Sequence, residues 1–316
     1  MRRHRRPTPI LAAAAAGALA LAGCTSAAAQ PRPAGAAGTP SPSAVSASPS
    51  ASASPTPKPA EGAPVHASIF EGDGATYGVG MPIILRFTRP VRDPHAIQQA
   101  IHISSVPPSM PGAWYWFSPT EAHYRPPFYW AAHATITMDA PLKGISAGPG
   151  LVVDDNLTLV MHTGASHVST INSTTLRMTV TSDGRPIRVI PVSLGKAGHR
   201  TFFGVKVVEA KTNPERMISD PPTGPGSYNV LVPWSVRVTN SGEFVHAAPW
   251  NPLVGQSNQS HGCTNLNTAD AKWFYNFSVV GDVVVTTQSA GMSRMRSWDG
   301  WGDWNVPWSV WSAGQS

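Results

Sequence analysis

The chain has 316 residues, of which 32 are Pro, 28 Gly and 11 Trp and 13% are charged, and this length is enough for two domains of ordinary size. The formal net charge of +6 includes four arginines among the first six residues, and in the rest of the chain 19 basic side chains face 17 acidic ones. The rest of the chain is therefore nearly neutral and lacks the clustered basic residues that binding to nucleic acid requires. This excludes nucleic acid as a partner.

Residues 1–23 are predicted to be a signal peptide. A basic segment precedes the apolar run 10–21, which is short for a membrane span but long enough for a signal-peptide core. The run ends in Leu21-Ala22-Gly23-Cys24, which resembles the bacterial lipobox. That resemblance implies that Cys24 is diacylated and becomes the first mature residue; an ordinary signal peptide and an uncleaved anchor are the alternatives. Two acyl chains anchor a protein stably, so we expect a lipoprotein on the outer face of the plasma membrane, with its body extending into the cell wall.

Residues 24–62 are predicted to be a linker. Nearly all of them are Ala, Pro, Ser, Thr or Gly, so the segment has too few apolar side chains to form a core. Where it is polyproline-like, such a linker extends roughly 3 Å per residue, for a reach on the order of 100 Å.

Residues 63–163 are predicted to be an antiparallel β-sandwich. Short apolar or alternating runs at 83–87, 134–138 and 157–161 are separated by Gly and Pro, with only residues 93–101 suggesting a short helix. The aromatic side chains of this region fit either a sugar-stacking surface or packing in the core and between domains, and we favour packing. These are Trp114, Trp116, Tyr124, Phe128 and Trp130.

Residues 164–290 are predicted to be a second, mainly β domain. The runs 173–181 and 185–194 flank Ser182-Asp183-Gly184, which is typical of a hairpin turn. Further strands are predicted at residues 205–210, 235–239, 242–246 and 279–287. A helix is predicted to begin at the cap sequence Asn267-Thr268-Ala269-Asp270 and to run through Tyr275.

The candidate site combines His246 with Ser260-His261-Gly262-Cys263-Thr264-Asn265. A cysteine attacks as its thiolate, whose formation at neutral pH is favoured by a histidine, a helix N-terminus or backbone donors. We expect all three here: His246 lies on a predicted strand seventeen residues before Cys263, and Cys263 lies just before the predicted helix. The amides of residues 262–264 are predicted to form an oxyanion hole.

Other interpretations of Cys263 stay open. A lone cysteine is often an inert apolar core residue. A zinc site of Cys263, His261 and His246 lacks a second nearby cysteine, so we expect no metal and no cofactor. Among thiol enzymes, papain-like and NlpC/P60-type peptidases place Cys before His, and a sortase needs a downstream arginine, of which the nearest, Arg294, lies outside the predicted core.

Residues 291–316 are predicted to be a Trp-rich C-terminal subdomain. It holds Trp298, Trp301, Trp304, Trp308 and Trp311, five of the eleven tryptophans. Their helical spacing is interrupted by glycines and a proline. We favour a structural belt packed against both domains over an exposed glycan or membrane binder.

The spacing of His246 and the hexapeptide 260–265 resembles the YkuD-type L,D-transpeptidase signature, with further similarity at residues 192–196, 244–250, 271–275 and 302–308. The strings Thr76-Tyr77-Gly78-Val79-Gly80-Met81-Pro82 and Tyr124-Arg125-Pro126 resemble the immunoglobulin-like domain that precedes the catalytic domain in actinobacterial members. The resemblance implies a mainly β chain, with an immunoglobulin-like β-sandwich followed by a YkuD-like β-sandwich catalytic domain with short helices.

The resemblance also implies residue roles. Cys263 is the acylated nucleophile and His246 the general base, oriented by the backbone carbonyl of Ala247 where relatives often have Ser. The remaining candidates shape the pocket, orient the Cys loop or assist the oxyanion: Met217 in a flap, Tyr228, Trp250, Ser260, His261, Gly262, Thr264 and Asn265. Residues 200–204 depart from the Pro- and Thr-rich turn usual in relatives, so the entry to the flap is expected to differ.

The implied activity is peptidoglycan transpeptidation. A tetrapeptide stem donates its diaminopimelyl group to Cys263 with release of D-Ala, and the side-chain amine of a neighbouring diaminopimelate accepts it to form a 3→3 cross-link. Carbapenem β-lactams are the implied inhibitors. An L,D-carboxypeptidase that uses the same site and a non-catalytic wall-binding lipoprotein are the alternatives.

Overall fold

The computed structural model describes residues 62–219, 222–224 and 227–314. The predicted signal peptide and lipidated Cys24, with nearly all of the predicted linker, lie outside the described residues. Within the described part of the chain, no helix combines the length and the apolar character needed to cross a membrane. The described chain is mainly β and contains two sandwiches, which we call the N-terminal sandwich (residues 62–163) and the C-terminal sandwich (residues 166–287).

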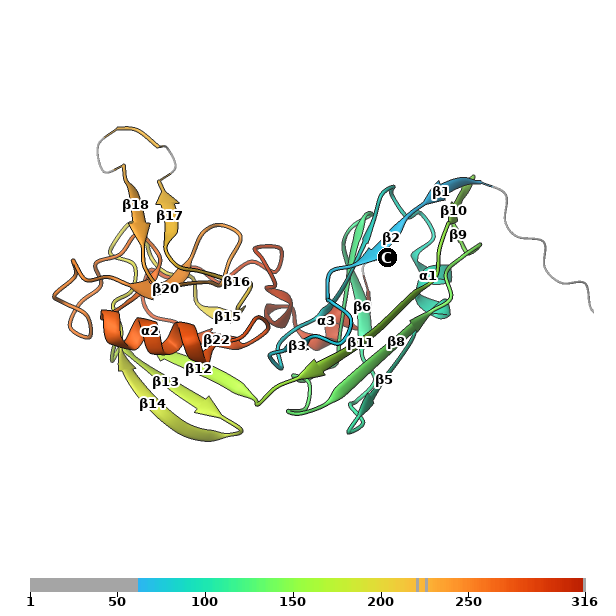
Figure 1. Cartoon of the computed structure of the whole chain (residues 1–316). Coiled ribbons are helices and arrows are strands. Elements are labelled where there is room, and N and C mark those ends of the chain that lie inside the picture. Colours follow the sequence, from blue (N-terminus) through green and yellow to red (C-terminus); the bar gives the residue numbers. More distant parts are fainter. Residues whose placement is uncertain (1–61, 220–221, 225–226, 315–316) are drawn as a thin grey trace, which may run out of the picture. The chain divides into compact units, whose positions relative to one another are not determined.

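The N-terminal sandwich packs two four-stranded sheets, β2-β4-β7-β6 and β3-β11-β8-β5, with a smaller sheet β1-β10-β9 beside them (Figure 1). Its elements are β1 (Ala63–Val65), β2 (Ala67–Ile69), β3 (Thr76–Tyr77), β4 (Ile83–Phe87), α1 (Pro94–Ala100), β5 (His102–Val106), β6 (Ala113–Ser118), β7 (Glu121–Arg125), β8 (Thr135–Ala140), β9 (Ser146–Gly148), β10 (Leu151–Val153) and β11 (Leu157–Thr163). Alternate side chains of β8 and β11 turn inward and form the core with those of the facing sheet.

Local signals predicted this domain well. Strand β4 coincides with the predicted run 83–87, and α1 falls inside the predicted helix 93–101, where the Asp93 carboxylate caps it by accepting from the Ala96 N–H at 3.3 Å. The packing interpretation of the aromatic residues is confirmed for Trp114, Trp116 and Trp130, which are buried. It is wrong for Phe128, whose side chain is 70% exposed.

The C-terminal sandwich packs a five-stranded sheet, β14-β13-β12-β22-β15, against a four-stranded sheet, β16-β19-β20-β21. Its elements are β12 (His167–Asn172), β13 (Arg177–Ser182), β14 (Arg185–Pro191), β15 (Gly204–Val207), β16 (Ala210–Thr212), β17 (Glu215–Ile218), β18 (Asn229–Val232), β19 (Ser235–Arg237), β20 (Phe244–Ala247), β21 (Thr264–Leu266), α2 (Thr268–Phe277) and β22 (Val283–Thr286). Strands β17 and β18 form a separate hairpin that extends away from the sheets (Figure 1).

The turn between β13 and β14 follows the sequence prediction. Asp183 and Gly184 have φ values of +48° and +75°, as a two-residue hairpin turn requires. Two other predictions were wrong in extent. The run 205–210 divides between β15 and β16, which belong to different sheets, and residues 173–176 form a turn rather than the start of β13.

The Trp-rich tail contains η1 (Asp303–Asn305) and α3 (Trp308–Trp311) and packs as the predicted structural belt. The indole N–H groups of Trp304 and Trp311 each donate to a backbone carbonyl of the N-terminal sandwich at 2.8 Å. The guanidinium of Arg125 lies over the rings of Trp304, Trp308 and Trp311 at 4.7, 5.5 and 4.3 Å. Trp298 does not share this packing, because its side chain is 61% exposed.

Candidate active site

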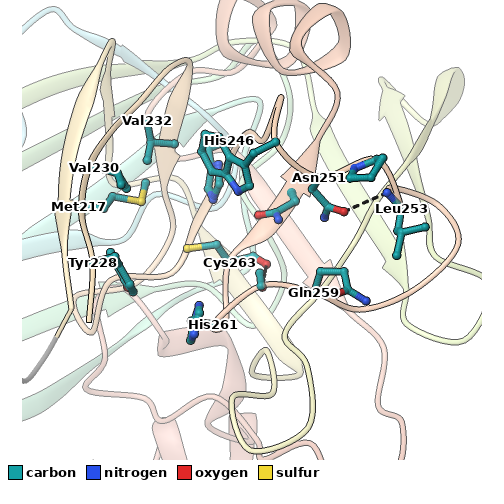
Figure 2. A pocket seen from close by; sticks show the side chains of 14 residues that line it. Met217, Tyr228, Val230, Val232, His246, Asn251, Leu253, Gln259, His261 and Cys263 are labelled. Carbon is teal, nitrogen blue, oxygen red and sulfur yellow. Dashed lines mark hydrogen bonds between the residues drawn. The ribbon is translucent and has the colours of Figure 1, made fainter. Parts of the chain in front are cut away.

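A cavity of about 500 Å³ in the C-terminal sandwich gathers most of the predicted site residues (Figure 2). Those that line it are Met217, Tyr228, His246, Trp250, Ser260, His261, Cys263 and Asn265. The other three predicted residues, Ala247, Gly262 and Thr264, are not among its lining residues and act on it through the backbone, as described below. The lining also includes residues that the sequence did not single out: Val230, Val232, Asn251, Pro252, Leu253 and Gln259.

Strand pairing brings His246 and Cys263 together. Strands β20 and β21 are parallel neighbours, and their register places His246 beside Asn265. Paired residues of a ladder have side chains on the same face, so His246 and Asn265 both face the pocket. Cys263 immediately precedes β21, so the loop 248–263 returns the thiol to the level of β20.

The imidazole of His246 is held as a neutral base. Its Nδ1–H donates to the backbone carbonyl of Ala247 at 2.8 Å, which leaves Nε2 with a free lone pair. The side chain is 4% exposed. Burial lowers the pKa of His246 to about 4, although the Ala247 hydrogen bond opposes the shift, so the ring is uncharged at neutral pH.

The thiol of Cys263 is also neutral at rest. Its S–H donates to the carbonyl oxygen of Gly242 at 3.6 Å, and burial raises its pKa to about 12. The predicted helix begins at its expected cap, Asn267, but the unpredicted strand β21 lies between this cap and Cys263. The expected preformed thiolate is therefore replaced by a neutral thiol beside a neutral base, which suits proton transfer during attack.

The loop that carries Cys263 is fixed from behind by hydroxyl groups. Ser260 Oγ donates to the Cys263 carbonyl at 2.6 Å and accepts from the Gly262 N–H at 3.1 Å. The Gly262 amide is thus occupied, and the prediction that it contributes to an oxyanion hole is wrong. Thr201 Oγ1 donates to the Gly262 carbonyl at 2.7 Å and accepts from the Gly195 N–H at 2.9 Å. Gly262 itself has φ of +130°, a conformation that favours glycine. Thr264 is buried in β21, where it pairs with Val245 of β20.

A buried ion pair lies behind this loop. Lys206 of β15 and Glu243, just before β20, form a salt bridge, and the Glu243 carboxylate also accepts from the Phe202 N–H at 2.7 Å. Sequence reasoning missed both charged residues and Thr201. Two signals were available: Thr201 lies in the segment 200–204 that departs from the family pattern, and Glu243 lies three residues before His246.

The β17–β18 hairpin forms one wall of the pocket. Met217 comes from β17 and Tyr228 directly precedes β18, and both side chains face the cavity on the side opposite Leu253 (Figure 2). Tyr228 lies with its ring centroid 5.6 Å from that of His261. Burial, and secondarily the nearby Cys263, raise the pKa of the Tyr228 phenol, so it stays protonated and able to donate a hydrogen bond.

Comparisons with known proteins assign the two domains to known families. The YkuD model, an L,D-transpeptidase catalytic domain, matches residues 166–286, and the Big_10 model, a bacterial Ig domain, matches residues 41–146. L,D-transpeptidase 1 of Mycobacterium tuberculosis is 30% identical over 226 residues, which cover 70% of this chain and 84% of that relative. The chain belongs to the L,D-transpeptidase family.

Other L,D-transpeptidases match more of this chain but are themselves longer. L,D-transpeptidases 2 and 5 of M. tuberculosis are 32% and 33% identical over 80% and 78% of this chain, which spans 64% and 55% of their own lengths. Among solved structures, LdtMt1 in complex with imipenem has a TM-score of 0.62 and 29% identity, covering 70% of this chain and 97% of that one. An L,D-transpeptidase from Mycobacterium smegmatis has a TM-score of 0.60, also at 29% identity, covering 72% and 100%. The predicted fold class, an immunoglobulin-like domain followed by a YkuD-like catalytic domain, is thereby confirmed.

Proposed function

We propose that this protein is a peptidoglycan L,D-transpeptidase that forms 3→3 cross-links between stem peptides through a thioester on Cys263. The observation that carries the proposal is that Cys263 lines one pocket with His246, whose Nδ1–H donates to the Ala247 carbonyl, so that Nε2 carries the lone pair of the neutral ring. Membership of the L,D-transpeptidase family supports the substrate class.

In the first half-reaction, Sγ of Cys263 attacks the carbonyl carbon of the diaminopimelyl residue in the donor tetrapeptide, and the thiol proton passes to Nε2 of His246. The tetrahedral adduct then collapses, the C–N bond to the terminal D-Ala breaks, and Nε2 returns the proton to the departing amine. A thioester remains on Cys263. Tyr228, which keeps its phenolic proton, is the side-chain donor that faces the developing oxyanion.

In the second half-reaction, the side-chain amine of a neighbouring stem attacks the thioester carbonyl. His246 Nε2 takes the amine proton and delivers it to the departing sulfur, which restores the thiol. A second cavity of about 690 Å³ shares Met217, Tyr228 and His261 with the first, so two substrates can approach from the two sides of this wall. This favours transfer to an amine over the L,D-carboxypeptidase reaction, which needs only water.

The test uses the chain from residue 24 onward with Cys24→Ser, in which Cys263 is the only cysteine. Incubation with a carbapenem is expected to add one drug mass to this protein and none to the Cys263→Ala variant, as read by intact mass. With a disaccharide-tetrapeptide, the expected products are free D-Ala and a cross-linked dimer. A tripeptide monomer alone would indicate the carboxypeptidase, and no adduct on folded protein would leave the wall-binding lipoprotein.

We also propose that Cys24 is lipidated and holds the protein on the outer face of the plasma membrane. Support comes from the lipobox-like sequence before Cys24. The expected result is that the full chain is recovered in the membrane fraction when expressed in an actinobacterial host, and that Cys24→Ser releases it. Equal membrane recovery of both forms would contradict the lipid anchor.

A further inference from the structure

Asn251, in the loop after β20, is held in one orientation by its own backbone surroundings. Its Oδ1 accepts from the Leu253 N–H at 3.0 Å (Figure 2). Its backbone N–H donates to the Ala248 carbonyl at 2.9 Å. Because Oδ1 is the acceptor of this turn, the other end of the amide must be the NH₂ group. The side chain is 9% exposed and lines the cavity that holds Cys263 and His246.

The Nδ2 group of Asn251 is buried and has no hydrogen-bond partner among the described residues. Asn265, which is 4% exposed and lines the same cavity, has an Oδ1 atom that is likewise buried without a partner among those residues. A buried polar atom without a partner lowers stability, and native proteins rarely keep one without a reason. The same pocket therefore contains one amide donor, Asn251 Nδ2, and one amide acceptor, Asn265 Oδ1, that a ligand could satisfy.

We propose that Asn251 is a substrate-binding residue whose Nδ2 donates to a backbone carbonyl of the donor stem peptide, while Asn265 Oδ1 accepts a peptide N–H. This inference rests on the proposed function. A peptide offers one carbonyl acceptor and one N–H donor at each link, which matches the two unpartnered amide atoms. A carboxylate fits less well, because it is acceptor-only and would be repelled by Asn265 Oδ1.

The assignment predicts a binding effect that is separable from catalysis. In the Cys263→Ala background, which cannot form the thioester, the dissociation constant of a disaccharide-tetrapeptide is measured by titration calorimetry. Asn251→Ser and Asn251→Asp both keep an oxygen that can accept from the Leu253 N–H, so the turn is retained, but neither has the NH₂ donor. Asn251→Ser is expected to raise the dissociation constant about three- to tenfold, the usual effect of losing one neutral hydrogen bond. Asn251→Asp is expected to raise it further, because its carboxylate also repels the substrate carbonyl.

The matched control is Asn156, an exposed residue of the N-terminal sandwich. Its Oδ1 accepts from the Lys143 N–H at 2.8 Å, so Asn156→Ser and Asn156→Asp make the same chemical change at another side-chain oxygen that accepts from a backbone N–H, far along the chain from the pocket. These variants are expected to leave the dissociation constant unchanged. Thermal unfolding of all four variants is measured to establish that each is folded.

The possible results distinguish a failure of the role of Asn251 from a failure of the proposed function. An unchanged dissociation constant in folded Asn251→Ser, or weakening of the same size in the Asn156 controls, overturns the role of Asn251. An absence of tetrapeptide binding by the Cys263→Ala parent overturns it as well. The carbapenem adduct on Cys263 tests the catalytic proposal independently, because it is read on protein with Asn251 unaltered.

Discussion

His246 and Cys263 are both uncharged at rest, and this predicts an unusual pH dependence for acylation. Burial lowers the pKa of His246 to about 4 and raises that of Cys263 to about 12. The reactive neutral pair is therefore populated throughout the range between these values, and activity is lost only when Nε2 is protonated in acid. The expected rate of carbapenem adduct formation is flat from about pH 5 to about pH 9 and falls below about pH 5.

The measurement is intact mass against time at each pH, with Cys263→Ala as the blank. A thiolate–imidazolium pair would behave differently, because each charge stabilises the other: the pKa of the thiol falls, that of the imidazole rises, and the pair is lost only when the imidazolium deprotonates on the alkaline side. A fall of the rate on the alkaline side of neutral pH, within the range expected to be flat, would therefore show that the resting pair is ionised.

Ser260 fixes the position of the nucleophile without touching the thiol. Its Oγ donates to the Cys263 carbonyl and accepts from the Gly262 N–H, so Ser260→Ala removes two hydrogen bonds from the loop. We expect the acylation rate to fall about ten- to a hundredfold, equivalent to about 1.4 to 2.8 kcal/mol in the barrier. Ser260→Thr keeps the hydroxyl and is expected to retain most of the rate. Equal losses of acylation rate in Ser260→Ala and Ser260→Thr would show that the Ser260 hydroxyl does not position the nucleophile.

At the scale of an element, helix α2 supports the sheet rather than the thiol. Asn267 caps it by accepting from the Asp270 N–H at 2.9 Å, and Ala271 and Phe274 are buried against the core. We expect Asn267→Ala to lower the free energy of unfolding by about 1 kcal/mol and to change the acylation rate less than about twofold. Asn267→Ser, which keeps a capping oxygen, is the control in urea unfolding. A large loss of acylation rate in folded Asn267→Ala would restore a role for this helix end in activating Cys263.

Elements with strong local signals could be predicted from the sequence, whereas those built by distant pairing could not. The Asp93 cap and the Asp183-Gly184 turn carry their own conformational preferences. Strand β21 has only three residues and exists because β20, nearly twenty residues earlier, lies beside it. The sequence therefore predicted the helix cap at Asn267 but not the strand that separates this cap from Cys263.

The same distinction holds within the site. The reacting pair could be identified from the sequence, because the hexapeptide 260–265 and its spacing from His246 form a recognisable motif. The support given by Thr201, Lys206 and Asn251 depends on which backbone atoms approach them after folding. No pattern of residue types in those segments specifies such contacts.

At the scale of the whole molecule, charged groups are buried where the N-terminal sandwich meets the tail. His123 of β7 contacts the Asp303 carboxylate at 3.0 Å and Glu121 at 3.2 Å. Burial disfavours its charge, but these two carboxylates outweigh burial and raise the pKa of His123 to about 9. Glu71 is the second such group. Here burial itself raises the pKa, to about 8, although the hydrogen bond that the Ile84 N–H donates to this carboxyl at 3.2 Å opposes the shift. The folded chain thus holds a protonated histidine and a protonated glutamic acid at neutral pH.

Both groups make the protein less stable as the pH rises. The folded pKa of His123 exceeds its ordinary value of 6.5, so its contribution is complete below about pH 6.5 and is lost as the pH passes about 9. Glu71 follows the same sign, because its folded pKa of about 8 exceeds its ordinary 4.5, and its contribution is lost from about pH 4.5 to about pH 8. Buried His246 has the opposite sign, because its pKa is lowered to about 4 and it adds stability up to about pH 6.5. We therefore expect the urea midpoint, read by tryptophan fluorescence, to fall steadily between about pH 6.5 and about pH 9.

Glu71→Gln isolates one of these two contributions. Glutamine is a neutral isostere of the protonated acid, and its amide oxygen can still accept from the Ile84 N–H. At pH 5 the variant is expected to lie within about 1 kcal/mol of the parent, since both side chains are then largely neutral. At pH 9 it is expected to be more stable than the parent, because the parent must hold a buried carboxylate there. Parallel midpoints for the two proteins across this range would show that Glu71 is ionised in the folded chain and that burial does not control its titration.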